Sequence, residues 1–327
     1  MTHKRQAFLF CRHAMIIVIK ENLLDASPSI RGLNYVVGSV WHDESNRHAR
    51  LRRLFLAGGW QVWKRLVRTP VSVPLFNGFR FRAYPDCQAS SAVLYTRIPN
   101  FKCLSFLRKH IERGVLLDIG ANVGLISVLL ADKIQHSILF EPNPIAAARA
   151  RENLALNHLN FEVHELALSD RAGVVEIENA GGVDSCNRTV VGFTTTLPTI
   201  SVPCNTVDGF LAKHSVLPVP ISAVKIDVEG HENAVLRGML GLLGTHRPKL
   251  VMFEYLRRTN LAETLELFSR VGYRVIELKA GEPAWATLKV SPLQDLFACP
   301  AELASEFVPP VSAGGNYRVV VTSNTTP

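Results

Sequence analysis

The sequence lacks several patterns that identify zinc-binding, secreted or membrane-spanning proteins. Its six cysteines lie far apart with no C-x-x-C pair, which argues against a zinc ribbon and a disulfide framework. No apolar run approaches the roughly 18 residues that span a bilayer, and Arg12 and His13 interrupt the apolar N-terminal stretch. We therefore expect a cytoplasmic protein without a secretory signal, in which most cysteines are buried in a reducing compartment.

Acidic residues are scarce in the first third of the chain. Residues 1–113 carry 19 Lys and Arg against 6 Asp and Glu, whereas residues 114–327 carry 17 against 22. A basic N-terminal segment indicates contact with anionic material, such as a phosphorylated substrate, a membrane surface or nucleic acid. The simpler alternative is that these basic residues contact only solvent and bind no anionic partner.

The apolar patterns divide the 327 residues into three parts. Residues 1–70 form a basic, mainly helical extension, although residues 1–45 favour neither helix nor strand. Residues 71–310 form the main domain, with its core at 114–300, and residues 311–327 are a tail without a core pattern.

Residues 46–67 have the spacing of an amphipathic helix. One side carries Leu51, Leu54, Phe55, Val62 and Leu66, basic residues occupy the rest, and Gly58-Gly59 predicts a break or a kink. Such a helix can lie on a membrane surface, which would make the protein peripheral to the membrane, or it can cap the domain. We favour the cap.

The main domain begins with predicted β-structure at residues 71–98, where Asn77-Gly78 marks a tight hairpin, and with a helix that ends at Gly114. Strands then alternate with helices, which predicts an α/β fold with a doubly wound, mostly parallel sheet. Any ligand should lie at the carboxyl ends of the strands. Strands are expected at GVLL, HSILFEPNP, FEVHELALSD, VVEIEN, TISVPCNTV, ISAVKID, PKLVMFEY and YRVIELKA, with ATLKV and DLFACP as candidates for the last one.

The stretch GVLLDIGANVGLISVLLA reads as a buried strand, a glycine turn and a helix, which is a loop that binds nucleotide-like ligands. A dinucleotide fingerprint would need glycines where Asn122 and Leu125 stand, and no Walker A motif follows. Asp118 would repel a diphosphate. Glu141 lies 21 residues beyond Gly120, where an acid accepts the hydroxyls of a ribose. These residues predict an adenosine-containing ligand without a pyrophosphate, and S-adenosylmethionine fits.

A second polar stretch, KIDVEGHE, follows a later strand. Lys225, Asp227 and Glu229 should share one face at the strand end, and Asp227, Glu229 or His231 could remove a proton from an acceptor hydroxyl or hold the acceptor. Capping of the next helix is the alternative for His231. Asp227 with Glu254, at the end of the next strand, could hold a divalent cation. Two carboxylates without a third ligand are a weak signal, so we expect no metal site.

The motifs DIGANVG, ALSD and KIDVEGHE, together with Glu141, resemble the FkbM-type family of S-adenosylmethionine-dependent methyltransferases. The similarity runs from roughly Pro85 to Pro300, and residues 1–70 match no pattern of the family. The resemblance implies a Rossmann-like class I sheet of seven strands, here with an N-terminal helical and β-hairpin extension. It also implies methyl transfer, usually to a hydroxyl oxygen of a sugar, glycolipid or natural product.

Carried over by position, the resemblance also assigns the cofactor-binding residues. Asp118, Gly120, Asn122 and Gly124 would line the methionine and ribose side, Glu141 would hold the ribose, and Ala167, Ser169 and Asp170 would border the adenine. An RNA methyltransferase that uses the basic N-terminal segment is a less favoured alternative, because no motif of a known RNA-binding module appears. A non-catalytic binding module with this fold is the third interpretation.

Overall fold

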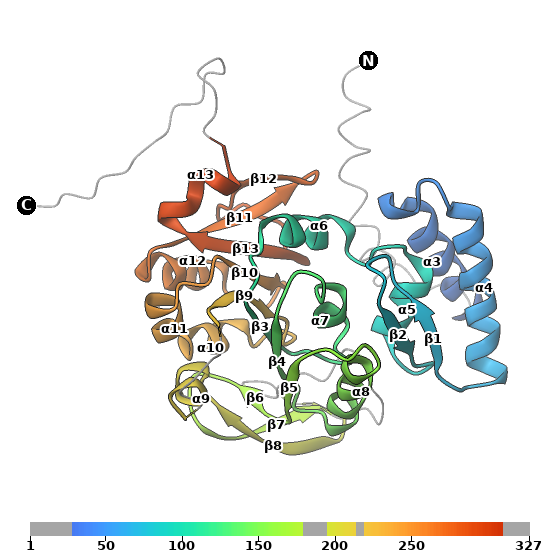
Figure 1. Cartoon of the computed structure of the whole chain (residues 1–327), viewed down its shortest axis with the longest axis horizontal. Helices are drawn as coiled ribbons and strands as arrows, with labels where there is room; N and C mark the ends of the chain where they lie inside the picture. The colour runs from blue at the N-terminus through green and yellow to red at the C-terminus, as the bar shows by residue number, and fades with distance from the viewer. Residues whose placement is uncertain (1–27, 179–194, 214–218, 310–327) are drawn as a thin grey trace, which may run out of the picture.

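The computed structural model describes residues 28–178, 195–213 and 219–309, and an eight-stranded sheet runs through its centre (Figure 1). The strand order is β12-β11-β13-β10-β9-β3-β4-β5. Apolar side chains of alternating residues fill two separate buried clusters, one on each face of the sheet. The strands are β3 (Val115–Ile119), β4 (His136–Phe140), β5 (Phe161–His164), β9 (Ile221–Ile226), β10 (Leu250–Tyr255), β11 (Tyr273–Lys279), β12 (Glu282–Trp285) and β13 (Gln294–Pro300).

The predicted α/β fold with a mostly parallel sheet is confirmed, with one strand more than expected. Strands β5, β4, β3, β9 and β10 are parallel neighbours, and β13 is antiparallel to the strands on both its sides. The eighth strand, β12, folds back on β11 as an edge hairpin. The candidate strand at ATLKV is wrong, because β12 ends at Trp285, before that stretch begins.

Helices cover both faces of the sheet and connect its strands (Figure 1). β3 and β4 are buried at every position, as expected for parallel strands that are covered on both sides. The helices are α7 (Leu125–Leu129), α8 (Pro144–Ala155), α9 (Val207–Lys213), α10 (Glu232–Arg237), α11 (Leu240–Thr245), α12 (Leu261–Arg270) and α13 (Ala304–Phe307).

The stretch FEVHELALSD does not form one strand. Its first part is β5, in the main sheet, whereas β6 (Ala167–Leu168) joins a three-stranded sheet of order β6-β8-β7. Strands β7 (Gly173–Glu178) and β8 (Thr199–Asn205) are the two predicted at VVEIEN and TISVPCNTV, and they pair antiparallel. The chain therefore leaves the main sheet after His164, and the turn predicted to border an adenine follows β6.

The N-terminal part is mainly helical, with the expected hairpin of β1 (Val71–Pro74) and β2 (Arg80–Ala83). Two expectations are corrected. Residues 71–98 are not all β-structure, because α5 (Gln88–Tyr95) follows the hairpin, and α4 (Arg50–Leu66) continues through Gly58-Gly59. Glycines cost helix stability, but buried packing at neighbouring positions outweighs that cost. The other helices are α3 (Pro28–His42) and α6 (Phe101–His110).

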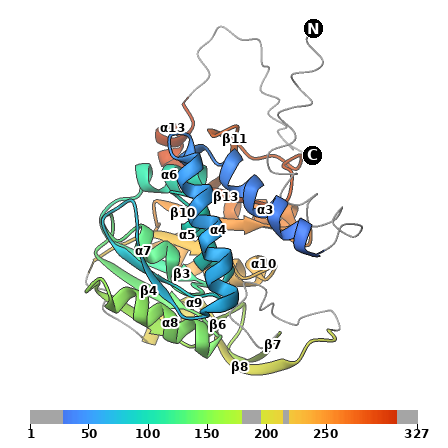
Figure 2. The same ribbon diagram turned by 90° about the vertical axis from the view of Figure 1, so that its right-hand side faces the viewer.

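Helix α4 caps the domain, but of its predicted apolar side only Leu54 packs against the core. Ala57 and Trp60 are its buried residues, and Trp60 Nε1 donates to Ser91 Oγ of α5 at 3.0 Å. Figure 2 turns α3 and α4 toward the viewer and shows them on the outside of the molecule. Among the described helices, none is both long and apolar enough to cross a bilayer.

Four cysteines, Cys87, Cys103, Cys204 and Cys299, are free and buried, as expected for small apolar residues. Cys11 and Cys186 lie outside the described residues. So do the first 27 residues, most of the loop near residue 190 and the predicted tail at 311–327.

Candidate active site

The glycine turn after β3 is in direct contact with the turn after β9. Gly120 has φ +72°, and a Cβ at this position would lie 1.9 Å from the backbone oxygen of Asp227. The Asp227 N–H in turn donates to the carbonyl of Ile119 at 3.0 Å. Only glycine combines this left-handed conformation with so close an approach, so the two motifs read from the sequence form one continuous site.

Asp118 is a fully buried carboxylate beneath this turn. Its Oδ2 accepts a hydrogen bond of 2.8 Å from Ser127 Oγ, and its Oδ1 lies 3.4 Å from Lys225 Nζ. Lys225 Nζ also donates to the Gly120 carbonyl at 2.6 Å and lies 3.5 Å from Asp227 Oδ2. Asp118 therefore holds the turn in place from below, and its role as a direct cofactor ligand stays a prediction.

Lys225 is a cation shared by both motifs. Burial alone would lower the pKa of its ammonium group, but the charges of Asp227, Asp118 and Glu141 outweigh burial and raise that pKa. A buried ammonium surrounded by carboxylates remains charged and fixes their positions. The sequence pattern placed Lys225 on the right face of its strand, but not in the predicted site.

Glu141 closes the other side of the glycine turn. Its Oε2 accepts from the backbone N–H of Asn122 at 2.7 Å, and its Oε1 accepts from that of Asn143 at 2.9 Å. Burial raises the pKa of Glu141 to about 7, although these two hydrogen bonds and Lys225 oppose the shift. Each carboxylate oxygen keeps a second lone pair for a ligand hydroxyl.

Two residues of the predicted turn act on its shape. Asn122 has φ +49°, and its Oδ1 accepts from the N–H of Val123 at 2.7 Å. A Cβ on Gly124 would lie 3.3 Å from Ala150 of α8, so this glycine lets α7 and α8 pack closely. Of the predicted loop residues, Asn122 presents its backbone to Glu141, and Gly124 supports the helix behind it.

His231 contacts the predicted adenine turn, and its catalytic role stays a prediction. Its Nε2 is 2.9 Å from Ser169 Oγ, and its side chain makes no capping hydrogen bond to α10. Burial lowers the pKa of His231, which favours the neutral ring. Asp170, beside Ser169, pairs with Arg237 at 3.2 Å. Ala167, in β6, is buried.

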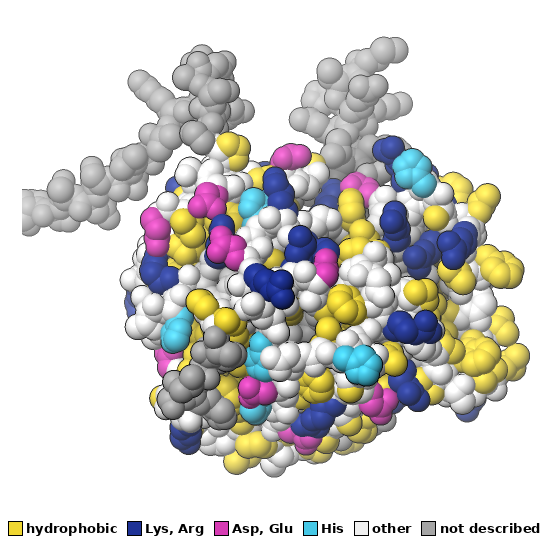
Figure 3. Space-filling view, viewed as in Figure 1, with side chains coloured by type: hydrophobic (Ala, Val, Ile, Leu, Met, Phe, Trp, Pro, Cys, Tyr) yellow, Lys and Arg dark blue, Asp and Glu magenta, His cyan; other side chains and the backbone are white. Residues whose placement is uncertain are grey.

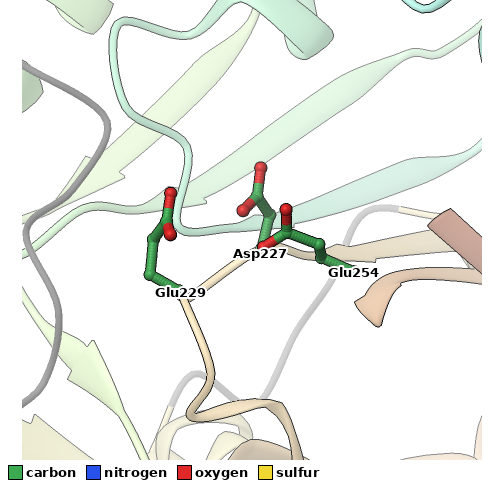
Figure 4. A group of neighbouring side chains, drawn as sticks. All are labelled: Asp227, Glu229 and Glu254. Atoms are coloured by element: carbon green, nitrogen blue, oxygen red, sulfur yellow. The ribbon is translucent and has the colours of Figure 1, made fainter. Parts of the chain in front are cut away.

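Three carboxylates gather at the ends of β9 and β10. Asp227, Glu229 and Glu254, the carboxylate trio, each place an oxygen within 4.8 Å of the other two, and Figure 4 shows them on one side of the strand ends. Lys225 faces Asp227, and Arg258 lies 3.6 Å from Glu229 Oε2. Three oxygens at this spacing can surround one hydroxyl oxygen at hydrogen-bond distance.

Glu254 is the most perturbed member of the trio. Burial, followed by the charges of Asp227 and Glu229, raises its pKa to about 9. Within the described residues no group donates a hydrogen bond to its buried Oε2. Asp295 faces Glu254 across the β10–β13 pair, and burial together with the charge of Asp227 raises the pKa of Asp295 to about 6. Burial and the neighbouring carboxylates therefore favour the protonated form of Glu254.

The buried Glu232 shapes the acidic turn, and the sequence patterns did not reveal this role. Its Oε1 accepts from the N–H of Gly230 at 2.9 Å and from that of Val228 at 3.3 Å. Glu232 belongs to the KIDVEGHE motif, so the signal was present there. Asp295 was missed because only the antiparallel return of β13 brings it beside β10.

Most residues of this site lie in a part of the chain that is similar to a known family. Residues 118–275 match the model of the methyltransferase FkbM domain. Hexuronic acid methyltransferase AglP of Haloferax volcanii is 30% identical over 133 residues, which are 40% of this chain and 52% of that protein. The match thus spans about half the length of the relative.

Solved structures resemble the chain less closely. A Pyrococcus abyssi tRNA methyltransferase, in complex with S-adenosyl-L-homocysteine, has a TM-score of 0.39 and 16% identity, covering 70% of this chain and 43% of that one. A precorrin-6y methyltransferase of Geobacter metallireducens has a TM-score of 0.36 and 12% identity, covering 62% and 87%. These low scores identify no substrate.

Proposed function

We propose that the chain transfers a methyl group from S-adenosylmethionine to a hydroxyl oxygen of a sugar, glycolipid or natural product, and the match of residues 118–275 to the methyltransferase FkbM domain supports this activity. One observation carries the proposal. The carboxylate trio adjoins the glycine turn through the Gly120–Asp227 contact. Groups suited to a cofactor and groups suited to a hydroxylated acceptor therefore meet at one edge of the sheet.

The residues around the glycine turn fit an adenosine-bearing cofactor. Glu141 has two lone pairs left for ribose hydroxyls after binding Asn122 and Asn143. Gly120 lets this turn lie directly against the turn after β9, and His231 with Ser169 offers polar atoms at the turn assigned to the adenine. When bound, S-adenosylmethionine supplies an electrophilic methyl group on a sulfonium sulfur.

The trio has the chemistry to position and deprotonate an acceptor hydroxyl. Asp227 Oδ2 faces Lys225, which leaves Oδ1 to take the hydroxyl proton as the oxygen bonds to the methyl carbon and the carbon–sulfur bond breaks. Glu254, whose raised pKa favours the protonated form, can donate a hydrogen bond to the acceptor. The name of the archaeal relative supports a hexuronic acid as the first acceptor to examine.

The decisive experiment measures methyl transfer to a panel of sugars, hexuronic acids and lipid-linked sugars by mass spectrometry. We expect Asp227→Asn to lower turnover at least a hundredfold while S-adenosylmethionine binds about as well as to the wild type. Glu302→Gln is the matched control, because Glu302 pairs with Arg247 after β13 and should retain full turnover. Equal turnover by Asp227→Asn, or no hydroxylated acceptor at all, would contradict the proposal.

A divalent cation in the trio is the less favoured alternative. The structure supplies Glu229 as the third carboxylate that the sequence did not indicate. However, Lys225 and Arg258 already accompany two of the three, and a cation would have to displace the proton that Glu254 retains because of its raised pKa. Calorimetric titration with Mg²⁺ or Mn²⁺, with Glu254→Gln as the comparison, distinguishes the two uses of the trio.

Two further alternatives are tested by the same assay. An RNA acceptor would use the basic N-terminal segment, and methylation of RNA but not of sugars would favour it. A non-catalytic binding module would bind the cofactor and convert none of it to S-adenosylhomocysteine with any acceptor.

A further inference from the structure

The outward side of α4 carries large apolar residues that contact solvent. Leu51, Phe55, Val62 and Leu66, the outward stripe, are 76%, 83%, 56% and 77% exposed. At 100° per residue these four positions fall within about 60° of one another, nearly opposite Ala57 and Trp60 on the packed side. The stripe extends for about 22 Å along the helix.

The charges around the outward stripe are of one sign. Helix α4 contains no acidic residue, and the exposed Arg52 and Arg65 flank the stripe on its two sides. Figure 3 shows hydrophobic and basic side chains intermingled over the part of the surface that α3 and α4 form in Figure 1. Trp41 of α3 is also exposed, at 44%.

From this arrangement we infer that α4 docks, parallel to the surface, on a membrane that contains anionic phospholipid. An apolar stripe with Leu and Phe, flanked by Arg, is what an interfacial helix needs, because acyl chains take the stripe and headgroups take the guanidinium groups. A second copy of the chain fits less well, since a twofold contact through the stripe would bring the arginines of both copies together. RNA fits less well because the apolar side chains of the stripe offer no charge or hydrogen bond to its phosphates.

The test is flotation of the full-length protein with vesicles of phosphatidylcholine alone and with about a third of phosphatidylglycerol added. Binding should appear with the anionic vesicles and fall with added salt. Phe55→Ser with Leu66→Ser should reduce the partition coefficient at least tenfold. Arg52→Gln and Arg65→Gln should each reduce it about fivefold.

The matched controls lie elsewhere on the surface. Leu288→Ser removes an apolar residue that is 69% exposed, and Arg113→Gln removes an exposed cation; both should leave vesicle binding unchanged. Because the substituted side chains contact solvent, each variant should keep the wild-type melting temperature. The proposal is overturned if the wild type does not float, if Phe55→Ser with Leu66→Ser floats equally well, or if that variant instead dissociates a dimer.

Discussion

At the scale of single residues, several ionisable side chains of the candidate site are buried. Glu141 has its pKa raised to about 7 from 4.5, mainly by burial. Because the folded protein holds this proton more tightly than the unfolded chain, the contribution to the free energy of unfolding is complete below pH 4.5 and is lost as the pH rises through about 7. The affinity for S-adenosylmethionine should instead increase as the pH rises through about 7, because Glu141 then becomes a carboxylate.

We predict that binding of S-adenosylmethionine weakens about three- to fourfold from pH 8 to pH 6. A ribose hydroxyl donates more strongly to a carboxylate than to a neutral carboxyl, by about 1 kcal/mol, and Glu141 changes between these forms near pH 7. Calorimetry at several pH values measures the effect.

The matched control for this measurement is Glu141→Gln, which cannot titrate. It should bind more weakly at pH 8 and lack the Glu141 step, so that the difference between the two profiles removes the titration of the ligand's own amino group. Parallel profiles for the two proteins would show that Glu141 does not hold the ribose.

At the scale of elements, two turns define the site, and each contains a glycine in a left-handed conformation that residues with a side chain rarely adopt. Gly120 has φ +72° and Gly230 has φ +99°. A Cβ on Gly230 would lie 1.9 Å from Nε of Arg258, the residue that accompanies Glu229. The strands hold the candidate site rigidly, and the two turns determine its shape.

We predict that Gly120→Ala destabilises the fold by at least ~3 kcal/mol, from the left-handed backbone and the collision with the Asp227 carbonyl together. Chemical denaturation measures the loss, and cofactor binding should disappear. Gly244→Ala is the control, because a Cβ there meets nothing within 4 Å; it should stabilise α11 by up to about 1 kcal/mol. A Gly120→Ala protein as stable as the wild type would refute the close contact.

The sequence predicted the elements best where burial is complete on both faces. β3, β4, β9 and β10 lie where unbroken apolar runs indicated them, and the site follows from their ends. The predictions from sequence failed where tertiary contacts determine the secondary structure. The Gly58-Gly59 pair does not break α4, α5 replaces predicted β-structure, and β6 leaves the main sheet.

The sequence predicted which residues lie near the candidate site, but not which side chains contact one another there. Motif spacing placed Asp227 and Glu229 near the glycine turn, but it could not show that Lys225 bridges Asp118 and Asp227. Nor could it show that the side chain of His231 contacts Ser169. Such contacts depend on side-chain direction, which sequence spacing leaves open.

At the scale of the whole molecule, the N-terminal helices share a core with the sheet. Buried Val36, Val40 and Trp60 belong to the same apolar cluster as Phe81 and Leu116. We proposed 1–70 as an extension, 71–310 as the domain and 311–327 as a tail. The shared cluster means that the boundary at residue 70 does not separate two cores.

We predict one cooperative unfolding transition that Trp60→Ala shifts as a whole. Loss of this buried indole should cost about 3–5 kcal/mol, because Trp60 is only 3% exposed. Trp63→Ala, on the same helix and 37% exposed, is the matched control and should cost under about 1 kcal/mol. Calorimetry that resolves two transitions, with only the smaller one moved by Trp60→Ala, would show an independent extension.

Lys225 links the glycine turn to the carboxylate trio, so the geometry of both depends on the same side chain. One ammonium group contacts the floor of the glycine turn and the first carboxylate of the trio. A ligand that orders either side therefore orders part of the other. By thermodynamic reciprocity, if the first ligand raises the affinity of the second by some factor, the second raises the affinity of the first by the same factor. Cofactor and acceptor should thus bind as cooperative partners rather than as independent occupants.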